Sequence, residues 1–121
     1  LIKDNHIALV GDIEKCINLA KKNEGSKIAV ECEVKDDKDA LTAILAGSDI
    51  VMLDNFTPKQ ARETIEHISK MGSRRRVKIE ASGGINRRNI KRYAQAKPDF
   101  ISVGYITHSA KAIDFSLEVT K

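Results

Sequence analysis

The sequence predicts an α/β fold in which parallel βα repeats form part of an open TIM-like (β/α) barrel. Short β-branched and apolar runs alternate with helix-like segments at a step of roughly 21 to 28 residues. Glycines and polar turns separate most of these segments. Such alternation is typical of right-handed βαβ units in a parallel sheet. A doubly wound open sheet is the alternative architecture, because it has the same alternation.

The first segments predict a strand end, a turn and a helix. Residues 1–3 are expected to end a strand that begins upstream, and residues 4–6 to form a polar turn. A helix over residues 12–23 is predicted to start at Asp12, because aspartate accepts hydrogen bonds from the first helical N–H groups. Apolar residues recur along it at helical spacing, at Ile13, Cys16, Ile17 and Ala20.

Two strands and one helix are predicted next. Residues 27–34 alternate like a half-buried strand. Residues 39–46 predict a helix with Asp37 as its cap, and Gly47 is expected to end it. The apolar run at residues 49–53 is typical of a strand covered on both faces.

The second half continues the same alternation. Thr57 is predicted to cap a helix that has Pro58 at its first position and ends near Gly72. Residues 77–81 predict a strand, and residues 86–96 predict a helix. Its inward side chains are expected to be Ile90, Tyr93 and Ala94.

The end of the chain predicts three further elements. Residues 100–103 read as a strand that ends at Gly104, and residues 105–112 as a loop or short helix. Residues 115–119 alternate between apolar and polar side chains, which predicts a last strand.

Composition limits the class of protein. The 121 residues are 41% hydrophobic and 31% charged, a balance typical of globular domains and not of disordered chains. Apolar runs are short, so no segment is expected to cross a membrane. The net charge of +4 comes with few aromatic residues, so the basic stretch at residues 74–76 is interpreted as a solvated face, with no nucleic-acid partner. Cys16 and Cys32 lack metal-ligand spacing and are expected to be reduced, which favours the cytoplasm.

Polar residues share one face of the predicted strands. Alternation places a set of them toward the barrel interior: Glu31, Glu33, Asp54, Lys78, Glu80, Ser82 and Gly104. Barrel interiors are normally apolar, so these charges are expected to be paired or functional. A neutralising network is the interpretation for Glu31, Lys78 and Glu80. Glu33 and Asp54 are expected at the ends of adjacent strands, where barrels carry their chemistry.

A strand is joined to a helix through Ser82, Gly83 and Gly84. Two glycines permit positive φ angles and let a ligand approach the backbone closely. Free N–H groups at the start of the following helix are expected to complete a phosphate site. The two nearby carboxylates predict a Mg²⁺–polyphosphate substrate, because Mg²⁺ takes few carboxylates together with waters and phosphates. A tight turn without a ligand is the alternative.

Five motifs occur together in one order along the chain. They are Ile2-Lys3-Asp4-Asn5-His6, Val30-Glu31-Cys32-Glu33-Val34, Met52-Leu53-Asp54-Asn55-Phe56, Glu80-Ala81-Ser82-Gly83-Gly84, and Ser102-Val103-Gly104 with Thr107-His108-Ser109. Together they closely resemble the quinolinate phosphoribosyltransferase family over essentially the whole chain. The resemblance implies a pentosyltransferase that makes nicotinate mononucleotide, pyrophosphate and CO₂ from quinolinate and phosphoribosyl pyrophosphate, with Mg²⁺, in NAD biosynthesis.

The resemblance also implies roles for individual residues. Lys3 would be the catalytic lysine near quinolinate and the reacting sugar. Glu33 and Asp54 would be catalytic, bind the ribose hydroxyls and hold Mg²⁺, directly or through water. The remaining substrate-binding residues would surround a phosphate group: Ser82, Gly83, Gly84, Gly104 and His108. Asn5 and Asn55 would brace the two rim turns, and His6 would be structural.

Domain organisation follows from the same resemblance. Residues 1–113 would form the C-terminal part of the barrel domain, and residues 114–121 a terminal strand of an N-terminal sandwich domain. The chain does not begin with Met and lacks the family's upstream arginines and His-Arg pair, so it is expected to be a fragment that is inactive alone. The full-length protein would be a cytoplasmic homodimer or larger homo-oligomer.

Two other functions remain open at this point. A related phosphoribosyltransferase acting on a different base would share these motifs, because the residues that choose the base lie upstream. A non-catalytic phosphate-binding module would share only the glycine turn.

Overall fold

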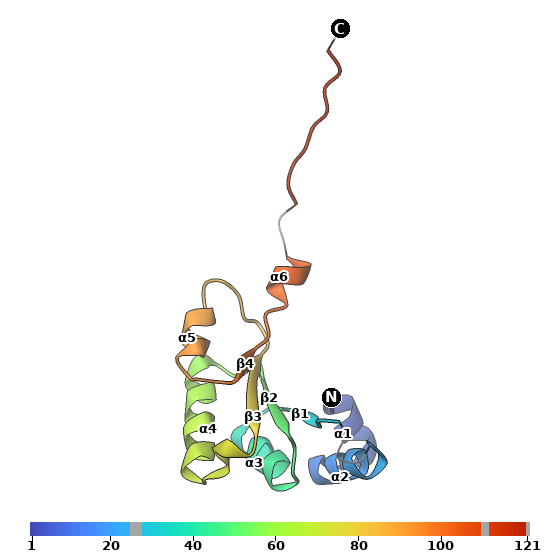
Figure 1. The fold of residues 1–121 in the computed structure, drawn as a ribbon, viewed down its shortest axis with the longest axis vertical. Coiled ribbons are helices and arrows are strands. Elements are labelled where there is room, and N and C mark those ends of the chain that lie inside the picture. The colour runs from blue at the N-terminus through green and yellow to red at the C-terminus, as the bar shows by residue number, and fades with distance from the viewer. Residues whose placement is uncertain (25–27, 110–111, 121) are drawn as a thin grey trace.

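A four-stranded parallel sheet organises the computed structural model, which describes residues 1–24, 28–109 and 112–120. Its strands lie in the order of the sequence (Figure 1): β1 (Glu31–Val34), β2 (Ile50–Asp54), β3 (Lys78–Ser82) and β4 (Phe100–Ile101). Ile2 extends the sheet beyond β1 through a parallel bridge to Cys32. Its N–H donates to the Glu31 carbonyl at 2.7 Å, and its carbonyl accepts from Glu33 at 2.9 Å. The predicted strand end at residues 1–3 is therefore confirmed at Ile2.

Side-chain alternation divides the sheet into two faces. One face is almost fully buried, with exposed fractions of 0% to 1% at Cys32, Val34, Val51, Leu53, Ile79 and Ala81. The opposite face of β1, β2 and β3 carries partly exposed side chains, including those of Glu33, Met52 and Glu80. Parallel register sets these three residues side by side across the sheet. The predicted polar face is therefore confirmed for these strands.

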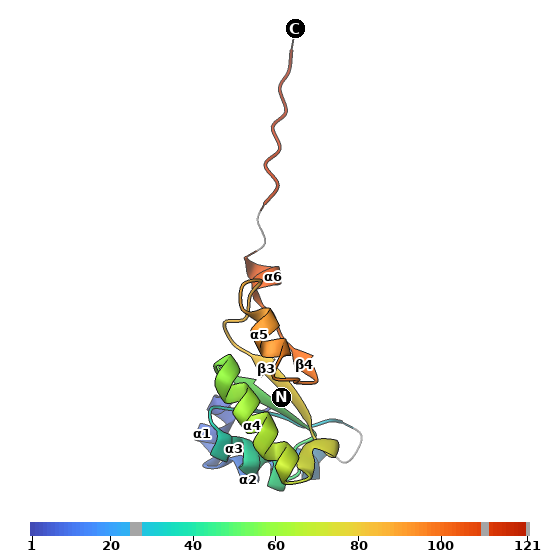
Figure 2. The ribbon, with the colours of Figure 1, turned by 90° about the vertical axis from the view of Figure 1, so that its left-hand side faces the viewer.

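Helices follow the strands in the same sequential order. The helices are α1 (Asp4–Val10), α2 (Ile13–Glu24), α3 (Asp37–Leu45), α4 (Pro58–Lys70), α5 (Ile90–Ala94) and α6 (Tyr105–His108), with a 3₁₀ turn η2 (Ser73–Arg75). Consecutive helices from α1 to α5 pack against one another (Figures 1 and 2). A doubly wound sheet would reverse its strand order at a switch point. The sequential order and the single buried face instead match part of a (β/α) barrel, as predicted.

The core lies between the buried sheet face and these helices. Ile17, Leu53, Ile68 and Ile79 are its largest fully buried side chains, so α2, α4, β2 and β3 all contribute. The predicted apolar face of residues 13–20 is confirmed, with Ile13, Cys16 and Ile17 buried. Both cysteines are buried and free. Burial raises the pKa of Cys32 to about 11, so this thiol stays protonated and unreactive at neutral pH.

Local capping explains where several helices begin. Asp12 accepts the Lys15 N–H at 2.7 Å before α2, and Thr57 forms a capping box with Gln60 before α4, with Pro58 first in the helix. Both starts are confirmed. The predicted turn at residues 4–6 is wrong, because these residues open α1. The Lys3 N–H donates to His6 Nδ1 at 3.0 Å, which satisfies a donor at the helix start.

Two other boundaries differ from the prediction. β1 begins at Glu31, after the described residues 28–30 that were predicted to belong to it, and the Val30 N–H donates to the Asp49 side chain at 2.8 Å; residue 27, the predicted start, lies outside the described residues. α3 is capped by Asp36, whose carboxylate accepts the Asp39 N–H at 2.8 Å, and not by Asp37. The loop or short helix predicted at residues 105–112 contains α6, which covers Tyr105–His108; residues 110 and 111 lie outside the described residues.

The last strand predicted at residues 115–119 does not form in this chain, and its assignment to a separate sandwich domain stays a prediction. Residues 112–120 carry no strand or helix and extend away from the rest of the fold (Figure 1). The apolar side chains of the segment are 77% to 93% exposed at Ile113, Phe115, Leu117 and Val119. A strand requires a neighbouring strand for its backbone hydrogen bonds, and this segment has none among the described residues.

No helix within the described ranges is both long and apolar enough to cross a membrane.

Candidate active site

The residues predicted from the sequence gather at the carboxyl ends of the strands. Lys3 follows Ile2, and the others end or follow the strands β1 to β4 in turn. Because the strands are parallel, these ends form one rim. The Lys3 Nζ lies 4.0 Å from Glu33 Oε2, with the lysine side chain 55% exposed and the glutamate side chain 14% exposed. The rim therefore has a sheltered carboxylate beside a reachable cation.

Asp54 is held in place by its neighbour Asn55. The Asn55 Nδ2 donates to Asp54 Oδ2 at 2.7 Å. The Asn55 backbone adopts a φ of 55°, and its N–H donates to the Ser82 carbonyl at 3.0 Å. Asparagine tolerates this left-handed conformation better than most residues. Asn55 thus joins the carboxylate at the end of β2 to the turn at the end of β3.

The glycine turn after β3 needs glycine at Gly83 for two reasons. Its φ is 90°, and a Cβ there would lie 2.6 Å from the Asn55 backbone nitrogen. Gly84 has a φ of 61°, but a Cβ there would meet no other atom within 4 Å. The first glycine is required by the protein's own packing, whereas the second leaves open space beside the backbone.

A cavity of about 410 Å³ opens at this glycine turn. It is lined by Ser82, Gly83, Gly84, Ile85, Asn86, Ser102, Gly104, Tyr105 and His108. Within the described part of the chain, no hydrogen bond uses the N–H of Gly83, Gly84 or Gly104 as its donor. His108 Nε2 would lie 3.1 Å from a Cβ at Gly104, so this side chain covers the backbone there. The cavity offers unused backbone donors and one histidine, a composition that suits an anionic group.

The helix that follows the glycine turn offers fewer free N–H groups to the cavity than the sequence predicted. α5 begins at Ile90 and not at residue 86, and Ala94 is exposed while Ala96 is buried. Asn86 and Asn89 together accept three N–H groups at the helix start. Asn89 Oδ1 accepts the Asn86 N–H at 2.8 Å, and Asn86 Oδ1 accepts the Arg88 N–H at 2.9 Å. The Asn86 carbonyl accepts the Ile90 N–H at 3.0 Å. The expectation that these groups bind a phosphate is wrong, because they are already paired. The sequence reasoning missed both asparagines, although asparagine before a helix is a recognised capping signal.

The predicted network of Glu31, Lys78 and Glu80 does not form, because Lys78 and Glu80 contact other residues. Lys78 Nζ lies 3.3 Å from Asp99 Oδ1, at the opposite end of β3 from the rim, so it does not neutralise Glu31. Glu80 accepts a hydrogen bond from Ser102 Oγ at 2.5 Å. Glu31 Oε1 is buried without a partner among the described residues. Burial first, and then the neighbouring charge of Glu80, raise the pKa of Glu31 above its ordinary value.

Glu33 and Asp54 lie on the same sheet face but not directly opposite each other. Glu33 pairs in register with Met52, and Asp54 stands two residues further along β2. Among the described residues, no group of three or more His, Cys, Asp or Glu side chains could hold a metal ion by itself. Glu33 and Asp54 provide carboxylate oxygens, the ligand type that Mg²⁺ takes together with waters and substrate phosphates.

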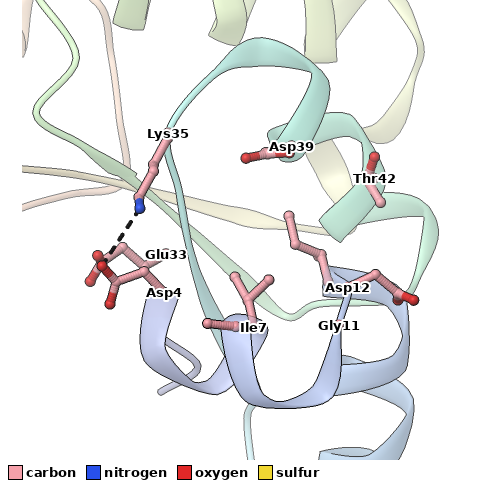
Figure 3. A pocket seen from close by; sticks show the side chains of 10 residues that line it. Asp4, Ile7, Gly11, Asp12, Glu33, Lys35, Asp39 and Thr42 are labelled. Atoms are coloured by element: carbon pink, nitrogen blue, oxygen red, sulfur yellow. Dashed lines mark ion pairs between the residues drawn. The ribbon is translucent and has the colours of Figure 1, made fainter.

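A second cavity, of about 440 Å³, lies between α1, α2 and α3 (Figure 3). Asp4, Asp12 and Asp39 line it together with Glu33, and Lys35 Nζ lies 3.5 Å from Asp4 Oδ2. The sequence did not predict this cavity. Its four carboxylates and single lysine disfavour a phosphate, so the glycine-turn cavity is the better place for an anion.

Comparisons with known proteins agree with this geometry. The family profile described as the C-terminal domain of quinolinate phosphoribosyl transferase matches residues 1–118. A protein of Methanothermobacter thermautotrophicus named "probable nicotinate-nucleotide pyrophosphorylase (carboxylating)" is 45% identical over 98% of this chain and 43% of its own length. The carboxylating nicotinate-nucleotide pyrophosphorylase of Rattus norvegicus is 38% identical over 98% of this chain and 39% of its own length.

A solved structure shows the same fold. The nicotinate-nucleotide pyrophosphorylase from Francisella tularensis matches with a TM-score of 0.78 and 41% identity, over 93% of this chain and 37% of that chain. The chain thus spans about two fifths of the length of the curated relatives it matches, as the shares of 43% and 39% show.

Proposed function

Because the chain belongs to the quinolinate phosphoribosyltransferase family, we propose that the full-length protein transfers a phosphoribosyl group from phosphoribosyl pyrophosphate to quinolinate. Decarboxylation follows and gives nicotinate mononucleotide, pyrophosphate and CO₂, a step of NAD biosynthesis. One observation carries the proposal: the anion cavity at Gly83 and Gly84 and the carboxylates Glu33 and Asp54 lie on one rim. A phosphorylated sugar needs both kinds of group at once.

We propose that the glycine-turn cavity binds a phosphate group of this sugar. The unused N–H groups of Gly83, Gly84 and Gly104 would donate to its oxygens, with Ser82 beside them. His108 would close the cavity over the bound group. Backbone donors fixed in this way stabilise an anion without having to reorganise when it binds.

The other rim residues would serve the reacting end of the sugar. As the bond from the anomeric carbon to pyrophosphate breaks, positive charge develops on the ribose ring, and Glu33 and Asp54 would stabilise it. Lys3, held near Glu33, would orient quinolinate so that its ring nitrogen faces the anomeric carbon. The carboxylate beside that nitrogen is then lost as CO₂, because the cationic ring accommodates the electron pair that remains until a proton replaces it.

We propose Mg²⁺ as the cofactor, held by Glu33 and Asp54 directly or through water. When bound, it would neutralise the negative charge of the leaving pyrophosphate. The two carboxylates are the protein's own share of this site, and they also keep the ribose hydroxyls oriented. Their small number suits a metal that arrives on its substrate.

Quinolinate carries two carboxylates, and Lys3 alone is a poor clamp for them because bidentate arginines do this better. The chain covers about two fifths of the relatives' length, as the 43% and 39% shares show. We therefore propose that the 121-residue chain does not turn over quinolinate by itself. Steady nicotinate mononucleotide production by the isolated chain would contradict this.

The assembly and location of the full-length protein are proposals of the same kind. We propose a homodimer or larger homo-oligomer in the cytoplasm, where phosphorylated sugars are kept and where thiols such as Cys16 and Cys32 stay reduced. We propose no nucleic-acid or membrane partner. Light scattering of the full-length protein tests the oligomer, and a monomer at working concentration would overturn it.

The experiment that tests the function compares two bases. The full-length protein is incubated with phosphoribosyl pyrophosphate, Mg²⁺ and either quinolinate or nicotinate, and nicotinate mononucleotide and CO₂ are measured. Product and stoichiometric CO₂ from quinolinate are expected. Product from nicotinate alone would instead favour a related enzyme for a different base, and no product from either would favour a phosphate-binding module without catalysis.

A further inference from the structure

The Gly84 carbonyl is held by two side-chain amides. Asn89 Nδ2 donates to it at 3.0 Å, and Asn86 Nδ2 donates to it at 3.3 Å. Asn89 is itself fixed, because its Oδ1 accepts the Asn86 N–H at 2.8 Å. The Asn89 amide therefore contacts Gly84 through its nitrogen and Asn86 through its oxygen.

Asn89 takes part in a reciprocal cap at the start of this helix. Its Oδ1 accepts the Asn86 N–H, while Asn86 Oδ1 accepts the Arg88 N–H at 2.9 Å and the Asn86 carbonyl accepts the Ile90 N–H at 3.0 Å. Through its Nδ2 the same side chain donates to the Gly84 carbonyl, so one amide links the helix start to the glycine turn.

The carbonyl of Gly84 determines where the next N–H points. The chain has no cis peptide bond among its described residues, and in a planar trans peptide the C=O and N–H point in opposite directions. With the Gly84 carbonyl drawn toward Asn89, the Ile85 N–H points away from it. Ile85 lines the glycine-turn cavity, and the residue as a whole is 3% exposed and packs in a cluster with Ala81 and Tyr93.

We infer that Asn89 is a positioning residue that holds the Gly84–Ile85 peptide so that the Ile85 N–H donates to the bound phosphate. No hydrogen bond between described residues uses this N–H. It joins the N–H groups of Gly83 and Gly84 on successive peptides, which is the arrangement of a backbone anion nest. The inference rests on the proposed function, because it takes the phosphate of the sugar substrate as the ligand.

Two substitutions of Asn89 separate positioning from folding and from charge. Asn89→Asp keeps an acceptor for the Asn86 N–H and remains a good cap, but it removes the donor to Gly84. Asn89→Ala removes the donor without adding a charge. Asn18→Asp, at an exposed asparagine of α2, makes the same chemical change away from the site.

The test uses the full-length protein and measures kcat, the KM for each substrate, the Kd for ribose 5-phosphate by calorimetry, and the unfolding midpoint. Both Asn89 variants are expected to raise the KM for phosphoribosyl pyrophosphate and the Kd for ribose 5-phosphate about 10-fold, as the loss of one hydrogen bond to a charged group does. The KM for quinolinate should stay within about 2-fold, because a phosphate contact is not shared with the base. Asn18→Asp should change none of these values.

Three outcomes of the comparison between the variants would overturn the inference. The first is an unchanged Kd for ribose 5-phosphate in both Asn89 variants. The second is a lower unfolding midpoint with unchanged KM values, which would assign Asn89 a structural role alone. The third is an effect of Asn89→Asp without one of Asn89→Ala, which would be repulsion by the added charge. A wild type that binds ribose 5-phosphate but does not convert quinolinate would refute the proposed reaction, and the Asn89 comparison would still test the inference. A wild type that binds neither ribose 5-phosphate nor inorganic phosphate would refute the proposed reaction and the inference together.

Discussion

At the scale of single residues, Asn55 and Gly83 depend on each other. Asn55 takes a left-handed backbone conformation, and its backbone nitrogen lies 2.6 Å from the position that a Cβ on Gly83 would have to take. This contact joins the Asp54 carboxylate to the glycine turn. The sequence predicted both residues at the rim, because glycines and asparagines at strand ends are local signals. It could not predict that they touch, since they lie on different strands.

The two glycines of the turn are therefore expected to respond differently to alanine. Gly83→Ala should lower the free energy of unfolding by about 3 kcal/mol, because positive φ and a backbone clash act together. Gly84→Ala should cost only about 1 kcal/mol. It should nevertheless weaken ribose 5-phosphate binding, because its methyl group would occupy the open space beside the donors. Denaturant unfolding and calorimetry of the full-length protein measure the two effects, and equal losses of stability would contradict this account.

The rim side chains allow a second prediction at this scale. Lys3→Ala, Glu33→Ala and Asp54→Ala in the full-length protein should each lower kcat/KM by about 100-fold or more. The two carboxylate variants lose charge stabilisation at the reacting sugar, and Lys3→Ala loses the orientation of quinolinate. Stability should change little, since none of them belongs to the apolar core. Glu63→Ala, on the exposed face of α4, is the matched control and should retain full activity. Rim variants with wild-type kinetics would favour a non-catalytic phosphate-binding module.

At the scale of elements, the sequence predicted what depends on near neighbours. Asp12, Thr57 and Pro58 each act within one helical turn, so their helix starts are where the sequence placed them. The errors arise from contacts between segments. β1 begins late because the Asp49 side chain, from beyond α3, takes the Val30 N–H. The partner of Lys78 is likewise Asp99, 21 residues away, and no periodicity reveals such a pair.

Asp99 is a junction between elements and makes stability depend on pH. Burial alone would raise the pKa of Asp99, but hydrogen bonds from the Ile79 N–H, Arg74 and Lys78 outweigh burial and hold this pKa below its ordinary value. A carboxylate with a depressed pKa stabilises the fold above its unfolded pKa, and this contribution is lost as the pH falls through the folded value. The Asp99 carboxylate therefore keeps its ion pairs with Arg74 and Lys78 at neutral pH and loses them only in acid.

Asp99→Asn should accordingly lower the free energy of unfolding by about 1 to 2 kcal/mol at pH 7, because it loses a charge that lies 2.6 Å from Arg74 and 3.3 Å from Lys78. The difference from the wild type should shrink below pH 4 as the native carboxylate protonates. Glu63→Gln, in an exposed pair with Lys59, should cost less than about 0.5 kcal/mol at either pH. Denaturant titrations at several pH values measure this, and a pH-independent difference would argue against the charge as its cause.

At the scale of the whole molecule, the chain contains surfaces that its own residues do not cover. The sheet ends at β4 on one side and at the Ile2 bridge on the other, so this chain contributes part of a barrel and not a closed one. The segment at residues 112–120 alternates apolar and polar side chains without a partner strand. The sequence predicted a strand there because alternation is a local property. Whether a strand forms depends on a partner, and none lies within the described residues.

We propose that residues 114–121 pair with a sheet of the sandwich domain in the full-length protein, while residues 1–113 belong to the barrel. Amide hydrogen exchange at residues 115–119 should then be slow, since paired backbone N–H groups are protected. Leu117→Asp should lower the unfolding midpoint, because a side chain that is 93% exposed here would be buried against that sheet. Glu118→Lys is the matched control, because alternation puts residue 118 on the opposite, solvated face. Rapid exchange throughout the segment, or equal effects of the two substitutions, would show that the tail stays unpaired in the whole protein as it does in this chain.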